Sequence, residues 1–483
     1  MSGEDAVLGI DLGTTQAKAG LITLDGALLG VGRAAYPLLT PTAGRAEQDP
    51  ADWWAAIRAA VAEASRAAGS RAQVRAISVV GQGPTTVCVG ADGSTLRPAI
   101  TWLDTRASAI TAGLEARLGV PSWQLGPLPH ERWLAAHEPE VHARTAAFLL
   151  PWDWLVGRLS GEAIRSVPPV SGHPSDATIV AGGGDPARFG RVVEWATPVG
   201  QLLPEPAADL GLGPGIPVIA GGNDALASFH GAGMTRPGDA IDTGGTSGGF
   251  AVYWDRRLEI PGTYRAASAL PGLWLYGGAM NATGKSLDWL RGLLDHHADD
   301  PADLLAEAAR TDPGADGLVF LPYLAGERSP IWDGRARGVF AGLTLAHGRG
   351  HLARAMLEGA AFALRHVAEP ILASGVEVRE MVVSGGTAAT HLWSQVKADI
   401  TGFPVAIPVV AETATLGAAV LAVLGLGAYP DAPAAMGAMV RIAERIEPRG
   451  ELRPRYDALY GVYRELYPAT RDLVHRLGDI AAG

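Results

Sequence analysis

Two short segments, in different halves of the chain, share a residue pattern that can bind a polyphosphate. Each ends an apolar, β-like run with an acidic residue, glycine and hydroxyl side chains, in Ile10-Asp11-Leu12-Gly13-Thr14-Thr15 and Ile241-Asp242-Thr243-Gly244-Gly245-Thr246-Ser247. Glycine lets backbone N–H groups approach phosphate oxygens, and the hydroxyl groups donate hydrogen bonds to them. A carboxylate such as Asp11 repels phosphate but can bind the Mg²⁺ that neutralises it. One Gly-Thr pair after a strand is usually a simple turn, but its repetition favours two phosphate-binding hairpins.

Strands and helices are predicted to alternate around both hairpins. In the first half, apolar spacing and turn residues predict strands at 21–24 and 28–31, a helix at 50–68 capped by Asp49, a strand at 75–80, a helix at 152–159, a loop at 168–186 and a strand at 216–220. In the second half they predict a hairpin at 239–253, a helix at 281–294, a strand at 318–321, a helix at 350–373, a strand at 380–384, a buried helix near 416–426, a looser segment at 430–449 and a closing helix at 456–477. The alternation indicates a duplicated α/β core with a nucleotide cleft between its halves.

Polar residues follow three of these strands. Gly81-Gln82-Gly83-Pro84 follows the strand at 75–80, and Gly221-Gly222-Asn223-Asp224 follows the strand at 216–220. Open α/β sheets bind ligands at the carboxyl ends of their strands, so these residues are candidates for a site. Gly385-Gly386-Thr387 joins a strand to a helix, and the N-terminus of a helix with bare backbone beside it suits a nucleoside phosphate.

Length and composition exclude several classes of protein. A chain of 483 residues with 48% hydrophobic and 18% charged residues is an ordinary folded protein of two or three domains. A net charge of −11 without a basic stretch argues against nucleic acid as a partner. The single cysteine, Cys88, excludes an internal disulfide and is expected in a core. The start of the chain has no signal-peptide pattern, and the longest apolar run is shorter than the roughly 20 residues that a bilayer requires. We therefore expect a cytoplasmic protein that does not bind a membrane.

Two further motifs invite a functional interpretation that we reject. Gly278 and Gly284-Lys285-Ser286 imitate a phosphate-binding P-loop, but five residues separate the two glycines where that motif has four, and no clear strand precedes it. His347 and His351 have the spacing of two metal ligands on a helix, but no third ligand lies near them in the sequence. We expect a helix in the first case and a solvated helix start in the second.

The motifs together resemble those of the FGGY carbohydrate kinases, which belong to the actin, hexokinase and heat-shock-chaperone nucleotide-binding superfamily. Within the family the chain is most similar to xylulokinases. The resemblance covers nearly the whole chain. Besides the first hairpin it rests on 99–106 (AITWLDTR), 221–224 (GGND), 321–328 (LPYLAGER), 337–343 (RGVFAGL), 357–362 (LEGAAF) and 463–468 (YRELYP).

The resemblance implies two α/β domains of the ribonuclease H-like, actin and hexokinase type on either side of the nucleotide. The first, residues 1–249, would bind the sugar and carry the first phosphate loop and the catalytic aspartate, and the second, residues 250–483, would bind the nucleoside. By position, the family's general base falls on Asp224 and its Mg²⁺-associated aspartate on Asp11. The resemblance places the ATP contacts on Gly13, Thr14, Thr15 and Lys18 in the first hairpin, on Gly245, Thr246 and Ser247 in the second, and on Gly385, Gly386 and Thr390 at the nucleoside.

The sugar side departs more from the family pattern. The resemblance places sugar contacts on Gln82, Trp102, Asp104 and Asn223. Xylulokinases typically have a Gln-Met-His loop, of which only Gln82 is present here. Ala225 stands where an amide often follows the catalytic aspartate, and Thr390 stands where an asparagine is common. The identity of the sugar is less well determined by these residues than the chemistry.

The implied reaction transfers a phosphoryl group from ATP, with Mg²⁺, to a hydroxyl of a small sugar or polyol. D-Xylulose is the expected substrate. The alternatives are another ketose or polyol, such as ribulose, erythritol or a glycerol-like compound, and a non-catalytic sugar sensor or actin-like ATPase. A sensor would be expected to lack Asp224 or Asp11, and both are present. The sequence does not distinguish a monomer from a homodimer.

Overall fold

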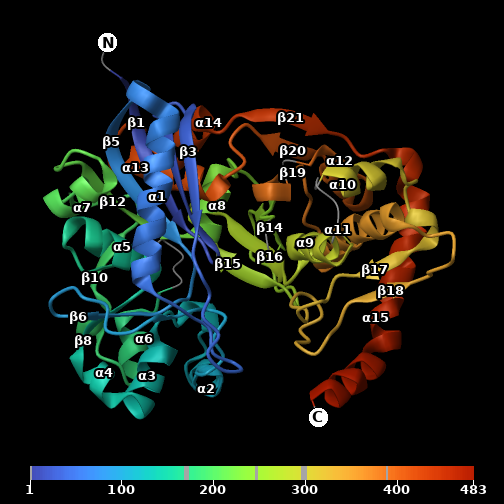
Figure 1. Cartoon of the computed structure of the whole chain (residues 1–483), viewed down its shortest axis with the longest axis horizontal. Helices are drawn as coiled ribbons and strands as arrows, with labels where there is room; N and C mark the ends of the chain where they lie inside the picture. Colours follow the sequence, from blue (N-terminus) through green and yellow to red (C-terminus); the bar gives the residue numbers. More distant parts are fainter. Residues whose placement is uncertain (1–2, 168–172, 245–247, 295–301, 388–389, 483) are drawn as a thin grey trace. The chain divides into compact units, whose positions relative to one another are not determined.

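Two compact units make up the protein (Figure 1). The computed structural model describes residues 3–167, 173–244, 248–294, 302–387 and 390–482. By the density of contacts, unit 1 comprises Met1–Gly233 and Glu412–Val440, and unit 2 comprises Met234–Ala411 and Arg441–Gly483. This division joins a segment from the second half of the chain to the first unit. The boundary after residue 249 stays a prediction for the functional domains.

Unit 1 is built around a sheet with the strand order β11-β12-β5-β1-β2-β3. β2 is antiparallel to β1 and β3, whereas β5 is parallel to β1 and β12. The elements of unit 1 are β1 Glu4–Leu12, β2 Gln16–Thr23, β3 Leu28–Ala35, β4 Glu47–Gln48, α1 Pro50–Ala68, β5 Ala72–Gly81, β6 Val87–Gly90, β7 Ala99–Ile100, α2 Ser108–Leu118, α3 Leu128–His137, α4 Pro139–Arg144, β8 Thr145–Leu149, α5 Pro151–Ser160, β9 Ile164–Val167, α6 Asp176–Ala181, β10 Arg191–Glu194, β11 Pro198–Gln201, α7 Pro204–Leu210, β12 Pro217–Asn223, α8 Asp224–Gly231, α13 Thr413–Gly425 and α14 Ala432–Met439.

Helices cover both faces of this sheet, which explains why residues 6–12 of the central strand β1 are buried without interruption. A Cβ on Gly30 or Gly32 of β3 would lie 2.1 Å from a carbonyl oxygen of α1, and one on Gly9 of β1 would lie 2.5 Å from a carbonyl oxygen of α13. Gly9 of β1 is paired with Gly20 of β2, which is paired with Val31 of β3, so these three residues point to one face of the sheet. Gly30 and Gly32 are the neighbours of Val31 along β3 and point to the other face. α1 and α13 therefore lie on opposite faces, and the glycines allow each helix to approach the sheet closely.

Unit 2 repeats this arrangement. Its sheet has the order β15-β16-β14-β13-β19-β20-β21, in which β14 is antiparallel to β13 and β16, and β19 is parallel to β13 and β20. The five strands β16, β14, β13, β19 and β20 thus match β3, β2, β1, β5 and β12 in order and direction. The elements of unit 2 are β13 Asp239–Asp242, β14 Gly248–Trp254, β15 Tyr264–Ala267, β16 Trp274–Met280, α9 Thr283–Leu294, α10 Ala302–Arg310, β17 Val319–Leu321, β18 Val339–Ala341, α11 Arg349–Ala373, β19 Glu380–Val383, α12 His391–Thr401, β20 Val405–Pro408, β21 Ile442–Ile446 and α15 Arg453–Ala482. The duplicated core predicted from the two hairpins is confirmed.

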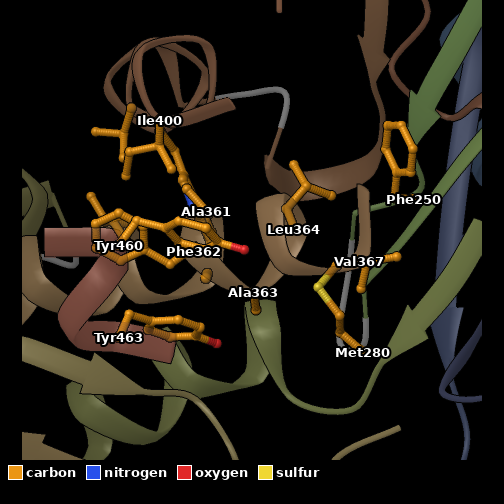
Figure 2. Close-up of a cluster of buried hydrophobic side chains, with 14 of the residues drawn as sticks. Phe250, Met280, Ala361, Phe362, Ala363, Leu364, Val367, Ile400, Tyr460 and Tyr463 are labelled. Carbon is orange, nitrogen blue, oxygen red and sulfur yellow. The ribbon is translucent and has the colours of Figure 1, made fainter. Parts of the chain in front are cut away.

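The core of unit 2 is organised around α11. Figure 2 shows one side of this helix, where Leu364 and Val367 lie near Phe250 of β14 and Met280 of β16, and another side, where Phe362 lies against tyrosines of α15. The ring centroid of Phe362 is 5.5 Å from that of Tyr463. α11 therefore links the sheet to the closing helix, and the helices predicted at 350–373 and 456–477 are both confirmed.

Two local predictions, the start of α1 and the burial of Cys88, are confirmed. α1 begins where expected, because the Asp49 side chain accepts a hydrogen bond from the Ala51 N–H and Pro50 occupies the first helical position. Cys88 is fully buried in a core. His351 contacts Asp316, with 3.2 Å between Nε2 and Oδ2, and the described residues contain no group of three or more potential His, Cys, Asp or Glu metal ligands. Among the described helices, none is long and apolar enough to cross a membrane.

Three local predictions were wrong. The segment 168–186, predicted as a loop, contains α6, which is capped by the Ser175 side chain; residues 168–172 lie outside the described residues. The looser segment 430–449 contains α14, capped by Asp431, and β21. The expectation that no clear strand precedes the P-loop-like segment was also wrong, because β16 leads into it. Gly278 lies inside that strand and pairs with Phe250, so the segment is still not a phosphate loop.

Candidate active site

The register of three parallel strands brings the predicted catalytic residues to one edge of the sheet in unit 1. Leu12 of β1 and Asn223 of β12 are both paired with Gly81, the last residue of β5. Asp11, Gln82 and Asp224 are adjacent in sequence to these three positions and therefore lie at the same edge. The polar residues that follow β5 and β12 thus lie beside Asp11 at this edge, whereas the Gly385 turn belongs to unit 2.

Asp11 has the environment of a metal-binding carboxylate. It is 4% exposed, and its Oδ1 has no hydrogen-bond partner within the described part of the chain. Burial raises the pKa of Asp11 to about 7, an effect that Lys18 opposes and that the nearby carboxylates Asp224 and Glu412 reinforce. A carboxylate that lacks solvation and has an unused oxygen is suited to a hard cation such as Mg²⁺, which usually takes one or two protein carboxylates and completes its shell with phosphates and water.

Lys18 is held by a residue that the sequence did not reveal. Its Nζ lies 2.5 Å from Oε2 of Glu412 and 3.9 Å from Oδ2 of Asp11, its partner across the hairpin. Glu412 immediately precedes α13, and its other oxygen lies 2.7 Å from Nη2 of Arg33. Burial disfavours the charged form of Lys18, but Asp11 and Glu412 outweigh it and raise the pKa. Lys18 is therefore a half-buried, charged group beside Asp11, as expected of a residue that would bind phosphate.

Asp224 begins α8 directly after β12, and Asn223 fixes its position. The Asn223 Oδ1 accepts hydrogen bonds from the N–H groups of Ala225, at 3.0 Å, and Leu226, at 3.3 Å, and so caps the helix. The Asp224 Oδ1 also accepts from Ala225, at 2.7 Å. Asp224 is half-buried, and burial raises its pKa against the opposing effects of the Ala225 N–H and Lys18. A carboxylate with a raised pKa is a stronger base, which suits the acceptor of a hydroxyl proton.

Gln82 and Trp102 hold the first hairpin in place. Gln82 Nε2 donates to the carbonyl oxygen of Gly13, at 3.2 Å, and to Gln48 Oε1, at 2.7 Å, while Gln48 Nε2 donates to the carbonyl oxygen of Thr14, at 2.7 Å. Trp102 Nε1 donates to the hydroxyl of Thr14, at 3.0 Å. Gln48 was not among the predicted residues. In this structure, Gln82 and Trp102 are thus tied to the phosphate hairpin; a direct contact with sugar remains a prediction for both.

Asp104 lies in an enclosed charge cluster. Its oxygens accept hydrogen bonds from the Ala46 N–H, at 2.7 Å, and from Nε of Arg106, at 2.8 Å. These hydrogen bonds outweigh the effect of burial and hold the pKa of Asp104 below its usual value. The visible role of Asp104 is to hold its own loop against Arg106, and its predicted contact with sugar is not tested by this arrangement.

In unit 2, the second hairpin follows β13 as the first follows β1. Asp242 occupies the position equivalent to Asp11, and its Oδ1 accepts from the N–H of Gly244, at 3.1 Å. Gly385 and Gly386 form a 3₁₀ turn after the neighbouring strand β19, and Thr390 precedes α12 without a side-chain cap bond. The predicted residues Gly245, Thr246 and Ser247 lie outside the described residues.

Comparisons with known proteins agree with this arrangement. Residues 6–174 match the N-terminal domain, and residues 243–426 the C-terminal domain, of the FGGY family of carbohydrate kinases. Xylulose kinase of Staphylococcus epidermidis is 30% identical, over 97% of this chain and 98% of its own. Gluconokinase of Bacillus subtilis is 26% identical, over 99% of this chain and 98% of its own.

A solved structure confirms the fold. The crystal structure of xylulose kinase from Rhodospirillum rubrum matches 97% of this chain and 100% of its own, with a TM-score of 0.80 and 32% identity. The protein therefore has the two-domain, actin- and hexokinase-like fold that the motifs predicted. The chain belongs to the FGGY family of carbohydrate kinases, as an ATP-dependent sugar kinase most like the xylulokinases.

Proposed function

We propose that the protein phosphorylates a ketopentose, D-xylulose, and that Asp224 accepts the proton of the attacking hydroxyl. The observation that carries this proposal is the placement of Asp11 and Asp224 at one sheet edge, close enough for the charge of Asp224 to raise the pKa of Asp11. Phosphoryl transfer needs these two functions side by side, namely a ligand for the phosphate-bound metal and a base for the nucleophile.

Each of the site residues would have its own role in the reaction. Asp11 would hold Mg²⁺, which when bound neutralises the phosphates and their developing charge. Lys18, kept charged by Asp11 and Glu412, would donate to the β- and γ-phosphates. Asp224, fixed by the capped start of α8, would orient the sugar hydroxyl and take its proton. Gly13, Thr14 and Thr15 would hold phosphate oxygens in unit 1. We assign further ATP contacts in unit 2 to Gly245, Thr246 and Ser247 and to Gly385, Gly386 and Thr390.

The charges in unit 1 favour a neutral sugar over gluconate, the second candidate, which the Bacillus subtilis relative suggests. Asp11 and Asp224 would both repel the carboxylate of gluconate. Lys18, the cation described beside them, is already paired with Glu412. The remaining donors of Lys18 are assigned to the phosphates of ATP, so Lys18 would not be available to the carboxylate of gluconate, whereas a ketopentose needs hydrogen bonds alone. A cytoplasmic location is part of the proposal, because the reaction consumes ATP.

A substrate panel tests this assignment. ADP release is measured with D-xylulose, D-ribulose, gluconate, erythritol and glycerol, each over a range of concentrations with saturating ATP and Mg²⁺. We expect the highest kcat/KM with D-xylulose, and gluconate at least about 100-fold lower, because an unpaired like charge near a binding site costs several kcal/mol. A higher kcat/KM with gluconate or with a polyol would overturn the ketopentose assignment.

A further inference from the structure

Asp11 and Asp242 occupy equivalent positions in the two units, yet their surroundings differ. Asp11 is the penultimate residue of β1 and Asp242 the last residue of β13, and each precedes a phosphate-type hairpin. Each also contacts a lysine, although the chain contains only Lys18, Lys285 and Lys397. Asp11 keeps an oxygen without a hydrogen-bond partner in the described structure. Asp242 uses one oxygen for the Gly244 N–H and the other for an ion pair with Lys397. Both oxygens of Asp242 thus have a partner, whereas Oδ1 of Asp11 has none among the described residues.

Lys397 reaches Asp242 from α12, on the segment that follows the predicted nucleoside turn. Both residues are 3% exposed, and the Lys397 Nζ lies against the Asp242 Oδ2 and 5.0 Å from the ring centroid of Trp393. A small cavity beside the pair is also lined by Gly244 and Thr283. A buried ion pair of this kind is weak evidence for stability as such, because desolvation offsets most of the attraction. A role in function therefore has to be considered.

The pair determines the charge at the start of the second hairpin, and Asp242 holds the backbone there at Gly244. Gly244 has φ of +46°, and the Asp242 Oδ1 holds its N–H. The main chain that leads into this turn is anchored as well, because the Ser384 N–H donates to the carbonyl oxygen of Asp242, at 3.1 Å, and the Ser384 hydroxyl to that of Thr243, at 2.8 Å. Without Lys397, the buried carboxylate of Asp242 would face this turn with no compensating charge.

We propose that Lys397 is a positioning residue for ATP, because it neutralises Asp242 so that the second hairpin can accept phosphate oxygens. The inference rests on the proposed nucleotide role of that hairpin. ATP carries several negative charges, and an uncompensated carboxylate at low dielectric repels them strongly. The carboxylate is nevertheless needed at this position, since its other oxygen fixes the Gly244 N–H. Lys397 allows Asp242 to hold the turn without repelling the ligand.

Four variants test the role of charge. Lys397→Met keeps the length of the side chain and removes its charge, Asp242→Asn keeps the acceptor for Gly244 and removes the opposite charge, and the double variant removes both. Lys285→Met is the matched control, because Lys285 is exposed on α9. Dissociation constants for ATP and for D-xylulose and the melting temperature are measured for each.

We expect Lys397→Met to raise the Kd for ATP roughly ten-fold or more, with the Kd for sugar within about two-fold of wild type. Asp242→Asn and the double variant should bind ATP within about three-fold of wild type, and Lys285→Met should not differ from it. If Lys397→Met fails to fold, the double variant still tests the inference. It carries neither charge of the pair, so a loss of ATP affinity in it would contradict the inference that Lys397 acts by neutralising Asp242. Equal weakening in all three variants at the pair would overturn the inference in favour of a purely structural role.

Thr246→Ala separates this inference from the function on which it rests. If Thr246→Ala leaves the Kd for ATP unchanged, the second hairpin does not bind nucleotide, and the proposed ATP contact and the inference both fail. If Thr246→Ala weakens ATP binding but a folded Lys397→Met does not, the nucleotide role stands and the inference alone is wrong.

Discussion

Asp224→Asn is expected to lower sugar-dependent kcat by at least about 10²-fold, the lower limit of what general-base catalysis contributes. Asparagine retains the size of aspartate and can still accept the hydrogen bond from the Ala225 N–H, but it cannot accept a proton. Affinity for ATP should change by less than about two-fold, because the phosphate contacts assigned here lie on other residues. The measurement is kcat with D-xylulose, together with the Kd for ATP and the melting temperature on the same sample.

The competing explanation makes Asp224 a structural residue at the start of α8. It predicts a lower melting temperature with turnover per folded molecule preserved. Asp5→Asn is a suitable control, because Asp5 is an exposed carboxylate of the same unit that pairs with Arg75. A folded Asp224→Asn variant that binds ATP and turns over at nearly the wild-type rate would exclude Asp224 as the base.

The second large effect is expected from Asp11→Asn. Removing the carboxylate that would hold Mg²⁺ should lower kcat on the order of 10²-fold and raise the Mg²⁺ concentration needed for half-maximal activity, because metal ions contribute several kcal/mol to such transition states. The melting temperature of this variant should not fall together with its activity. The variant removes a buried, poorly solvated charge, so its melting temperature in EDTA at pH 8 should equal or exceed that of wild type.

A Mg²⁺ titration of kcat in wild type and Asp11→Asn tests the assignment, with melting curves in EDTA as the structural measure. Unchanged Mg²⁺ dependence in a folded variant would remove Asp11 from the metal site. A loss of activity matched by a fall in melting temperature would instead make Asp11 a structural residue of the hairpin.

Local signals explain what could be predicted of the fold. Asp49 and Pro50 mark the start of α1, and the two hairpins mark the first strands of a duplicated sheet, since each depends on residues close together in the sequence. The same is true of Asp224, which the end of β12 places at the sheet edge. α6 and α14 were missed because proline and glycine around them obscured the capping residues Ser175 and Asp431.

Partners that are distant in the sequence account for what was missed at the site. Glu412 and Lys18 are 394 positions apart, and only the packing of α13 on β1 brings them together. Lys397 reaches Asp242 in the same way, through the placement of α12 beside the second hairpin. Gln48 bonds to Gln82 and Thr14 from a two-residue strand that has no sequence signature of its own. In each case the contact joins residues that no local sequence pattern connects, and it is visible only in three dimensions.

We expect the γ-phosphoryl group of ATP to be transferred to a sugar hydroxyl at the edge where Asp11 and Asp224 lie. Phosphorus NMR of the wild-type protein with ATP, Mg²⁺ and D-xylulose follows that group directly. We expect a new phosphomonoester signal that grows in equal amount with ADP and is absent without sugar. Appearance of inorganic phosphate in place of the phosphomonoester, with D-xylulose and with every other sugar of the panel, would contradict it and identify an ATPase.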